Sequence, residues 1–143
     1  MILKELLREN SEVFKLTEDN RIRDVAAMMH EKHIGSIVIV DDSDYVVGII
    51  TDRDIALGLA LGVATPESYV TEVMSRDVET VRESMSLFDV TRFFKTANVK
   101  RLPVVNEELQ LVGVVSYDDV IALLAREMFD TCQALEPKLG HMI

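Results

Sequence analysis

Cysteine and long apolar runs are what this sequence has least of. Its single cysteine, Cys132, has no partner for a disulfide within the chain, so a reducing compartment, the cytoplasm, is expected. No run reaches the roughly 18 uninterrupted apolar residues of a membrane helix. The first residues include Glu5 and Glu9 and contain no small-residue cleavage site, which argues against a signal peptide.

Positive charge is also scarce. The chain has 15 Lys and Arg residues against 25 Asp and Glu residues, which gives a formal net charge of −10. This charge repels nucleic acid and anionic membrane surfaces as general partners. It also opposes an anionic ligand, so any phosphate site must gather its few basic side chains locally.

What the sequence does contain is a motif that occurs twice. Residues 48–55 read GIITDRDI and residues 113–120 read GVVSYDDV, so glycine, two β-branched residues, a hydroxyl, an aspartate and an aliphatic residue follow in the same order. The interval between the copies is 65 residues, and it relates Thr51 to Ser116. Two copies at such a long period indicate a duplicated domain rather than a repeat array.

Each half of the chain predicts the same order of elements, β-α-β-β-α. Helical spacing of apolar residues, β-branched runs and polar turns give this order. In the first half, strands are expected at 13–16, 36–40 and 45–50, and helices from Asp19 or Asn20 to Glu31 and from 51 to 61. In the second half, strands are expected at 78–81, 102–105 and 110–115, and helices at 85–95 and 117–133. A separate short helix is expected at 1–9.

Caps and core positions follow from the same pattern. Gly35 should end the first repeat helix, and Ser84 should cap the corresponding helix of the second half. The tail around Pro137 and Gly140 is expected to fray. The core side of the first repeat helix should carry its apolar residues, Ile22, Val25, Ala26 and Met29.

This combination resembles the tandem cystathionine-β-synthase (CBS) domain pair, or Bateman module. The resemblance rests on the β-α-β-β-α order, on the G-h-h-[ST]-x-x-D ending of both copies (h is aliphatic) and on their in-phase duplication, from about Ser11 to Glu127. It implies an α/β (α+β) fold in which two repeats pack sheet against sheet with pseudo-two-fold symmetry and leave two clefts. The expected division is an N-terminal helical segment at 1–10, repeats at 11–62 and 70–130, a linker at 63–69 and a tail at 131–143.

The resemblance also implies a ligand and the residues that bind it. Members of this family often bind adenosine nucleotides in the two clefts, and sometimes other adenosyl compounds. Asp54 and Asp119 would hold ribose hydroxyls, and Thr51 and Ser116 would lie by the ribose or phosphate. Strand backbone, such as that around Pro103, would contact the adenine.

Helix capping is a simpler explanation of the same motif. Thr51-x-x-Asp54 and Ser116-x-x-Asp119 fit a capping box, although Asp is shorter than the usual Glu at the third position. A hydroxyl cap satisfies free N–H groups, and an early aspartate suits the helix dipole. The two explanations are compatible, because a helix N-terminus can also present its N–H groups to a phosphate.

The basic residues near the motif differ between its two copies. Lys100 and Arg101 immediately precede a predicted strand at the mouth of the second cleft, whereas their equivalents, Gly35 and Ser36, are uncharged. In the first copy, Arg53 is the expected phosphate partner. A charge-assisted hydrogen bond contributes about 1.5–3 kcal/mol, so the second cleft is expected to bind the more phosphate-rich ligand more tightly.

Other candidate residues have simpler explanations than a site. His30 and His33 lie near a helix end without a third ligand, so no metal site is expected. Cys132 has no histidine partner, and the acidic turn at 41–44 is expected to be solvated rather than to bind a hard cation. No nucleophile has a base beside it, so neither catalysis nor a required cofactor is expected.

The function predicted from these points is regulatory. The chain should bind an adenosine-containing nucleotide such as AMP, ADP or ATP and act on another, unidentified polypeptide. A sensor of S-adenosylmethionine or NAD is one alternative, and a ligand-free scaffold or dimerisation module is another. Stabilisation by nucleotide would separate the ligand sensor from the scaffold.

A homodimer is also expected, because the helices after the two motifs carry apolar stripes that one pair of repeats does not need for its core. The stripe on the last helix consists of Ile121, Leu124, Ala125 and Met128. A lesser stripe on the earlier helix consists of Ile55, Leu59 and Gly62. Docking of the N-terminal segment on the main stripe is the alternative to a dimer.

Overall fold

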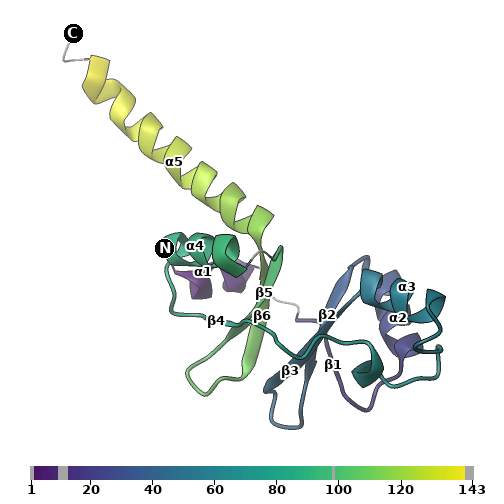
Figure 1. Cartoon of the computed structure of the whole chain (residues 1–143). Coiled ribbons are helices and arrows are strands. Elements are labelled where there is room, and N and C mark those ends of the chain that lie inside the picture. Colours follow the sequence, from purple (N-terminus) through teal and green to yellow (C-terminus); the bar gives the residue numbers. More distant parts are fainter. Residues whose placement is uncertain (1, 10–12, 98, 141–143) are drawn as a thin grey trace.

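The computed structural model describes residues 2–9, 13–97 and 99–140, which form two α/β units (Figure 1). The first unit consists of β1 (Lys15–Thr17), α2 (Ile22–Lys32), β2 (Ser36–Val40), β3 (Val46–Thr51) and α3 (Asp52–Ala60). The second consists of β4 (Val81–Arg82), α4 (Leu87–Ala97), β5 (Arg101–Val105), β6 (Leu111–Ser116) and α5 (Tyr117–Gly140). The helix α1 (Leu3–Glu9) precedes the first unit, and the 3-10 turn η1 (Val70–Glu72) precedes the second. The β-α-β-β-α order predicted for each half is confirmed.

The two units correspond element by element. The elements α4, β5, β6 and α5 begin 65 residues after α2, β2, β3 and α3. Each sheet has three strands, with the middle strand parallel to the first and antiparallel to the third. Even the hairpin turns match, because Asp44 and Leu109 both adopt a left-handed conformation with φ of 66°.

The two sheets lie at the centre of the molecule, and α2, α3 and α4 lie on its outer sides (Figure 1). The strand β2 shows why, because Ile37 and Ile39 face the helices of their own unit whereas Val38 and Val40 face the other sheet. A strand that is buried on both faces needs an uninterrupted apolar run, and this run is residues 37–40. The cluster between the sheets includes Leu111 of the second unit.

Equivalent residues of the two units touch where the units meet. Tyr45 and Gln110 form an antiparallel bridge, and Arg101 Nη1 donates a hydrogen bond to Ser36 Oγ at 3.3 Å. The members of each pair are 65 residues apart. Equivalent positions can touch only near a symmetry axis, so a pseudo-two-fold axis passes between them. The predicted packing of sheet against sheet with pseudo-two-fold symmetry is therefore confirmed.

Each unit is covered by the segment that precedes the other unit. The helix α1 packs on the second unit, where Leu3 and Leu6 are buried in the core with Val120 and Leu123. Its Leu7 covers Gly113, at which an added Cβ would come within 2.6 Å of the leucine side chain.

The segment at 70–75, which precedes the second unit, packs on the first in the same way. Val70 and Met74 are buried in the core of the first unit, and Ser75 exchanges two backbone hydrogen bonds with Ile49, at 2.9 and 3.0 Å. Met74 covers Gly48 as Leu7 covers Gly113, with its sulfur 2.6 Å from where a Cβ would be.

The predicted starts of two helices are wrong. The helix α4 begins at Leu87, and Ser86 Oγ rather than Ser84 accepts a hydrogen bond from Asp89 N, at 3.2 Å. The helix α2 begins at Ile22 because the Asp24 carboxylate accepts from Arg21 N at 2.8 Å. The predicted cap, Asn20, instead accepts from Thr17 N at 2.9 Å and so closes the preceding turn.

The predicted ends of two helices are also wrong. The helix α2 ends at Lys32, and His33 caps it in the left-handed conformation (φ 55°) that was expected of Gly35. Gly35 lies beneath the Asp52 carboxylate, which would be 3.2 Å from an added Cβ. The helix α5 continues to Gly140 instead of fraying near Pro137, and it projects away from the two units (Figure 1).

One predicted core residue of α2 is not in the core. Ala26 is exposed, whereas Ile22, Val25 and Met29 are buried as predicted. Among the described residues, α5 included, no helix is both long enough and apolar enough to cross a bilayer.

Candidate functional site

The first copy of the motif forms the start of α3. Thr51 Oγ1 accepts a hydrogen bond from Asp54 N at 3.1 Å, and the Asp54 carboxylate accepts from Thr51 N at 2.9 Å. These two bonds make a complete capping box. One carboxylate oxygen of Asp54 is therefore already used within the chain.

The second copy forms the start of α5 and is only half as complete. Ser116 Oγ accepts from Asp119 N at 3.1 Å. Within the described part of the chain, the Asp119 carboxylate accepts no hydrogen bond and joins no ion pair, and the residue is exposed. Both Asp119 oxygens are therefore available to a ligand hydroxyl, which is the role that the resemblance implies.

The strands place the two turns at the same end of their sheets. Ser36 is opposite Thr51 in the antiparallel pair β2–β3, and Arg101 is opposite Ser116 in the pair β5–β6. Each turn is closed by an equivalent backbone hydrogen bond, from Asp52 N to Gly35 O at 3.0 Å and from Tyr117 N to Lys100 O at 2.9 Å. The structure thus brings Lys100 and Arg101 next to the second motif, as the sequence predicted.

Three basic residues surround these turns without a carboxylate partner. Arg53, Lys100 and Arg101 are exposed, and none of them forms an ion pair with a described residue. Some basic side chains elsewhere do find carboxylates, in the pairs Lys15–Asp44, Arg23–Glu67, Arg76–Glu18 and Arg82–Glu107. The two turns thus hold three basic side chains without an ion pair among the described residues, beside the acidic residues of the motif itself, Asp52, Asp54, Asp118 and Asp119.

Arg101 reaches further than the sequence indicated. Its guanidinium donates to Ser36 Oγ at 3.3 Å, across the boundary between the units. Ser36 was noted in the sequence only as an uncharged equivalent, so its contact with Arg101 was missed. The 65-residue interval between the two positions was the available signal, because equivalent residues meet at a two-fold axis.

Pro103 lies inside the second sheet and is buried opposite Val114. The short strand β4 pairs only with Val104 and Val105, so the missing N–H of Pro103 breaks no bond to β4. Pro103 is two residues after Arg101 in the same strand. Contact of this strand with adenine stays a prediction.

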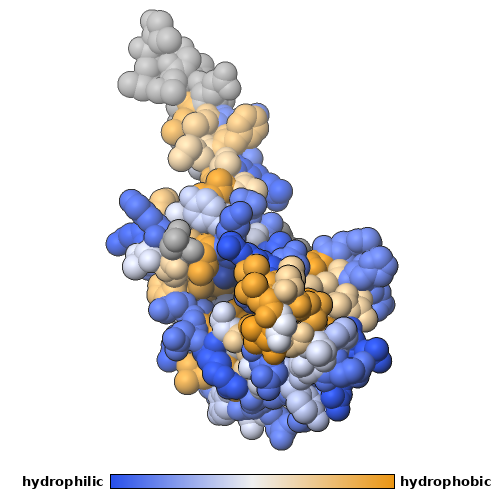
Figure 2. Space-filling model, turned by 45° about the vertical axis from the view of Figure 1, so that its right-hand side comes forward, coloured by the Kyte–Doolittle hydropathy of each residue, from blue (hydrophilic) through white to orange (hydrophobic). Residues whose placement is uncertain are grey.

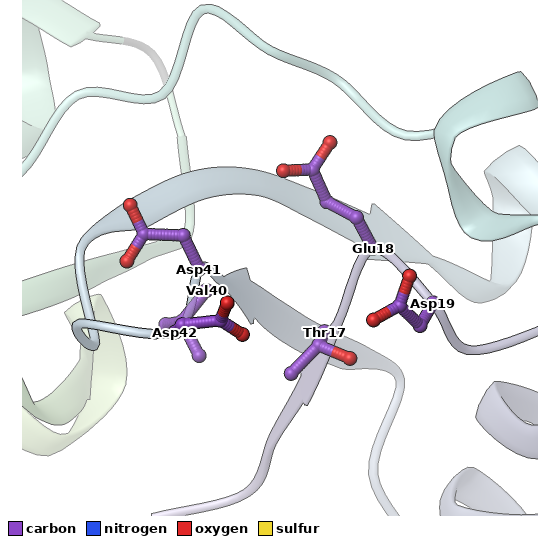
Figure 3. Close-up of a pocket in the computed structure, with 6 residues that line it drawn as sticks. All are labelled: Thr17, Glu18, Asp19, Val40, Asp41 and Asp42. Carbon is purple, nitrogen blue, oxygen red and sulfur yellow. The ribbon is translucent and has the colours of Figure 1, made fainter.

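An acidic pocket lies at the opposite end of β2 from Ser36 (Figure 3). Its volume is about 200 Å³, and its lining includes Glu18, Asp19, Asp41 and Asp42. The carboxylates spread around the opening rather than converging (Figure 3), and no group of described residues could hold a metal ion. The pocket repels phosphate, so it is not a candidate nucleotide site.

The remaining candidates from the sequence have simpler structural roles or are exposed. Asp41 Oδ1 accepts from Ser43 N and Tyr45 N, at 2.9 and 3.0 Å, and so stabilises the hairpin turn. His33 ends α2, and His30 and Cys132 are exposed. None of these three belongs to a metal-binding group of described residues.

Two matching α/β units with equivalent motif turns around a pseudo-two-fold axis define a tandem-repeat module with two equivalent candidate sites. The sequence model of the CBS domain matches residues 3–60 and 70–126, so the chain belongs to the CBS domain family. The CBS domain-containing protein YhcV of Bacillus subtilis is 30% identical over 110 residues, which are 77% of this chain and 77% of YhcV.

Other relatives are longer than this chain. The uncharacterized protein MK0525 of Methanopyrus kandleri is 32% identical over 99 residues, which are 68% of this chain and 50% of MK0525. The uncharacterized protein MJ1232 of Methanocaldococcus jannaschii is 29% identical over 80% of this chain and 37% of its own length. The chain thus spans half or less of these two relatives.

Solved structures confirm the resemblance of fold. The CBS domain pair of protein MJ0100, in complex with 5′-methylthioadenosine and S-adenosyl-L-methionine, matches with a TM-score of 0.76 and 27% identity, over 89% of this chain and 98% of that one. The cytosolic domain of the Mg2+ channel MgtE, in complex with ATP, matches with a TM-score of 0.68 and 29% identity, over 79% of this chain and 45% of that one. Both structures hold an adenosine-containing ligand, and both share the fold of this chain.

Proposed function

We propose that this chain is a regulatory module that binds an adenosine-containing nucleotide, AMP, ADP or ATP, beside its two motif turns. The observation that carries the proposal is the group of Arg53, Lys100 and Arg101, which has no described carboxylate partner in a chain of net charge −10. The helices α3 and α5 begin at the two motifs, so the positive ends of their dipoles further favour an anion. A phosphate would complete this arrangement.

Each residue of the turns has a role in this proposal. Asp119 and Asp54 accept hydrogen bonds from ribose hydroxyls, and Ser116 and Thr51 lie beside the ribose or phosphate. Asp119 is the better equipped of the two aspartates, because both of its oxygens are available. The basic side chains bind phosphate oxygens, and the strand around Pro103 contacts the adenine.

The relatives support adenosine as the shared part of the ligand. The MJ0100 pair holds methylthioadenosine and S-adenosylmethionine, and the MgtE domain holds ATP, so all three ligands contain adenosine. Phosphate is present in only one of them. The basic residues of this chain are the reason to choose a nucleotide over S-adenosylmethionine, while NAD, which also has phosphates, belongs in the same test.

The proposed action is binding and not catalysis, and it needs no cofactor beyond the regulatory ligand. A module of this kind acts by passing its occupancy to another protein, whose identity the chain does not reveal. We place this action in the cytoplasm, as a homodimer, without nucleic acid or membrane as a partner. The exposed apolar residues of α3 and α5 support the dimer.

A ligand-free scaffold is the second candidate function, and the first motif favours it. The complete capping box of Thr51 and Asp54 accounts for both residues without a ligand. The second motif does not fit this explanation equally well, because Asp119 makes no described bond through its carboxylate.

A thermal-shift panel tests the proposal. The panel consists of AMP, ADP, ATP, NAD, S-adenosylmethionine and guanine nucleotides. A ligand at about 100 times its dissociation constant should stabilise the folded state by roughly 2.7 kcal/mol, which raises the melting temperature by several degrees. Stabilisation by adenine nucleotides supports the proposal. If no member of the panel shifts the melting temperature, the ligand-free scaffold is the remaining candidate function.

A further inference from the structure

The Arg101 side chain spans the distance from one motif turn to the other. Its backbone lies opposite Ser116 in the β5–β6 ladder. Its Nη1 atom donates to Ser36 Oγ at 3.3 Å, and Ser36 lies opposite Thr51 in the β2–β3 ladder. Arg101 therefore starts from a backbone position beside the second motif and reaches the first unit with its guanidinium.

At the position of Arg101 the two repeats provide one arginine between them, in addition to Arg53 of the first motif. The position equivalent to Arg101 is Ser36 itself, because the two residues are 65 positions apart. Arg101 is exposed and forms no ion pair among the described residues, so it is available to an anion on either side. Lys100 has no corresponding contact with the first unit, since its equivalent Gly35 has no side chain to meet it.

We infer that Arg101 is shared, so that two phosphate-bearing ligands compete for it and bind with negative cooperativity. This inference rests on the proposed function. The first phosphate takes the guanidinium, which carries one positive charge and a fixed fork of donors. A second phosphate then lacks this cation and also meets the negative charge of the first. Because coupling between sites is reciprocal, the penalty is the same whichever site fills first.

A ligand without a phosphate places no demand on Arg101. Two adenosine molecules, or one adenosine and one AMP, should therefore bind without this penalty. The arrangement favours mixed occupancy, in which one site holds a phosphate-bearing nucleotide and the other an adenosine compound that is uncharged at its 5′ end. The module would then respond to the two classes of ligand together.

Calorimetry with AMP and adenosine on variants that isolate each site tests the sharing. Asp119→Ala removes the ribose contact of the second site and keeps the first site intact. Asp54→Ala does the reverse. Where loss of the capping box makes Asp54→Ala unfold in the assay, Asp54→Asn replaces it. Adding Arg101→Ala to either of these variants should weaken AMP binding about tenfold or more. It should leave adenosine binding unchanged in both. Adding Lys100→Ala, the matched control, should weaken AMP binding only where the second site is intact.

The same titrations measure the competition. In the unmodified chain, the product of the two AMP dissociation constants should exceed the product of the constants of the isolated sites by about 5- to 150-fold. With Arg101→Ala, or with adenosine as ligand, this ratio should fall to about one.

Each result other than these overturns the inference. If Arg101→Ala weakens AMP in only one background, or if the ratio is close to one in the unmodified chain, Arg101 is not shared but the proposed function stands. If neither AMP nor adenosine binds the unmodified chain, the proposed function fails and the inference fails with it.

Discussion

Asp54 and Asp119 hold equivalent places in the two repeats, but only Asp54 is bonded to its own helix. Asp54 accepts from Thr51 N at 2.9 Å, whereas Asp119 accepts from no described donor. In the first repeat, helix capping and ligand binding could both explain the aspartate. In the second repeat, the carboxylate takes no part in capping. An aspartate that has no structural bond to lose is the better place to ask whether the motif binds a ligand.

Replacing Asp119 by asparagine should weaken ligand binding and leave the fold intact. Asparagine keeps the shape but turns one acceptor oxygen into a donor, so part of the contact with a ribose diol is lost. We expect a loss of about tenfold in AMP affinity by calorimetry and a change of only a few tenths of a kcal/mol in the free energy of unfolding. An unchanged affinity together with that small loss of stability would assign Asp119 to the helix dipole alone.

Asp24 should make stability depend on pH at the acid end. A hydrogen bond from Arg21 N, and then one from Asn20, hold the pKa of Asp24 below its usual 3.8. The folded state therefore gains stability above the unfolded pKa, and this gain is lost as the pH falls through the lower pKa of the folded state. Denaturant unfolding between about pH 6 and pH 2.5 should show a flatter acid limb for Asp24→Asn.

The control for this comparison is Asp19→Asn, which removes the same charge from an exposed residue that has no described hydrogen bond through its side chain. It should leave the shape of the acid limb unchanged. Equal effects of the two substitutions would mean that net charge, and not the bond to Arg21, determines the slope.

Contacts within one repeat could be predicted from the sequence, whereas contacts between repeats could not. Thr51 and Asp54 are three residues apart, so their spacing alone predicts the capping box that the structure contains. The bond from Arg101 to Ser36 depends on how two sheets pack, which no local pattern describes. The contacts of the site residues with a ligand also depend on more than local sequence, and they remain predictions.

Among the elements, the hairpin strands were easier to predict than helix ends or the first strand of each unit, since β4 is Val81–Arg82 and not 78–81, and β1 is Lys15–Thr17 and not 13–16. The strand β2 was predicted with its observed bounds, because a β-branched run between a glycine and an acidic turn allows few alternatives. The start of α4 was wrong because Ser84 and Ser86 compete for the same role, and only tertiary contacts decide between them. Above all, the sequence did not reveal that α1 and the segment at 70–75 would each cover the opposite unit.

The two covered glycines should differ in their tolerance of a side chain. An added Cβ at Gly48 would lie 3.0 Å from the backbone oxygen of Ser75 as well as 2.6 Å from the Met74 sulfur. At Gly113 it would meet only the Leu7 side chain, which can move. Gly48→Ala should cost about 1–3 kcal/mol of unfolding free energy and Gly113→Ala less, in urea unfolding experiments. The opposite order would mean that α1 is held more rigidly than the backbone bridge at Ser75.

At the scale of the whole molecule, the helices leave apolar surface uncovered. Figure 2 turns the side with α2 and α3 forward and shows a hydrophobic patch there. The exposed residues of α3 and the turn after it are Leu57, Leu59, Leu61 and Val63. On α5 they are Ile121, Met128, Phe129 and Leu135. The cluster that contains α1 includes Val120 and Leu123 of α5, and Leu124 of the main stripe packs against it in part. The other stripe residues, Ile121, Ala125 and Met128, stay exposed.

A charge on the α5 stripe should therefore separate a dimer. Met128 is 69% exposed, so Met128→Glu adds a charge without disturbing a core, whereas Leu124, although part of the predicted stripe, is partly buried. We expect the unmodified chain to be a dimer by light scattering at tens of micromolar and Met128→Glu to be a folded monomer. Asp130→Lys, which changes a charge at an exposed position on the opposite face of the helix from Met128, should stay dimeric. A monomeric unmodified chain would contradict this prediction.

The exchange of covering segments means that neither repeat is a complete folding unit. A chain cut in the linker near Thr65 yields a first half whose β3 lacks the segment at 70–75, and a second half whose β6 lacks α1. Each half carries the missing part of the other, so we expect the two to be insoluble or unfolded when expressed alone and to assemble when co-expressed, as followed by co-purification. Moving one repeat into another protein should therefore require moving the leading segment of the other repeat with it.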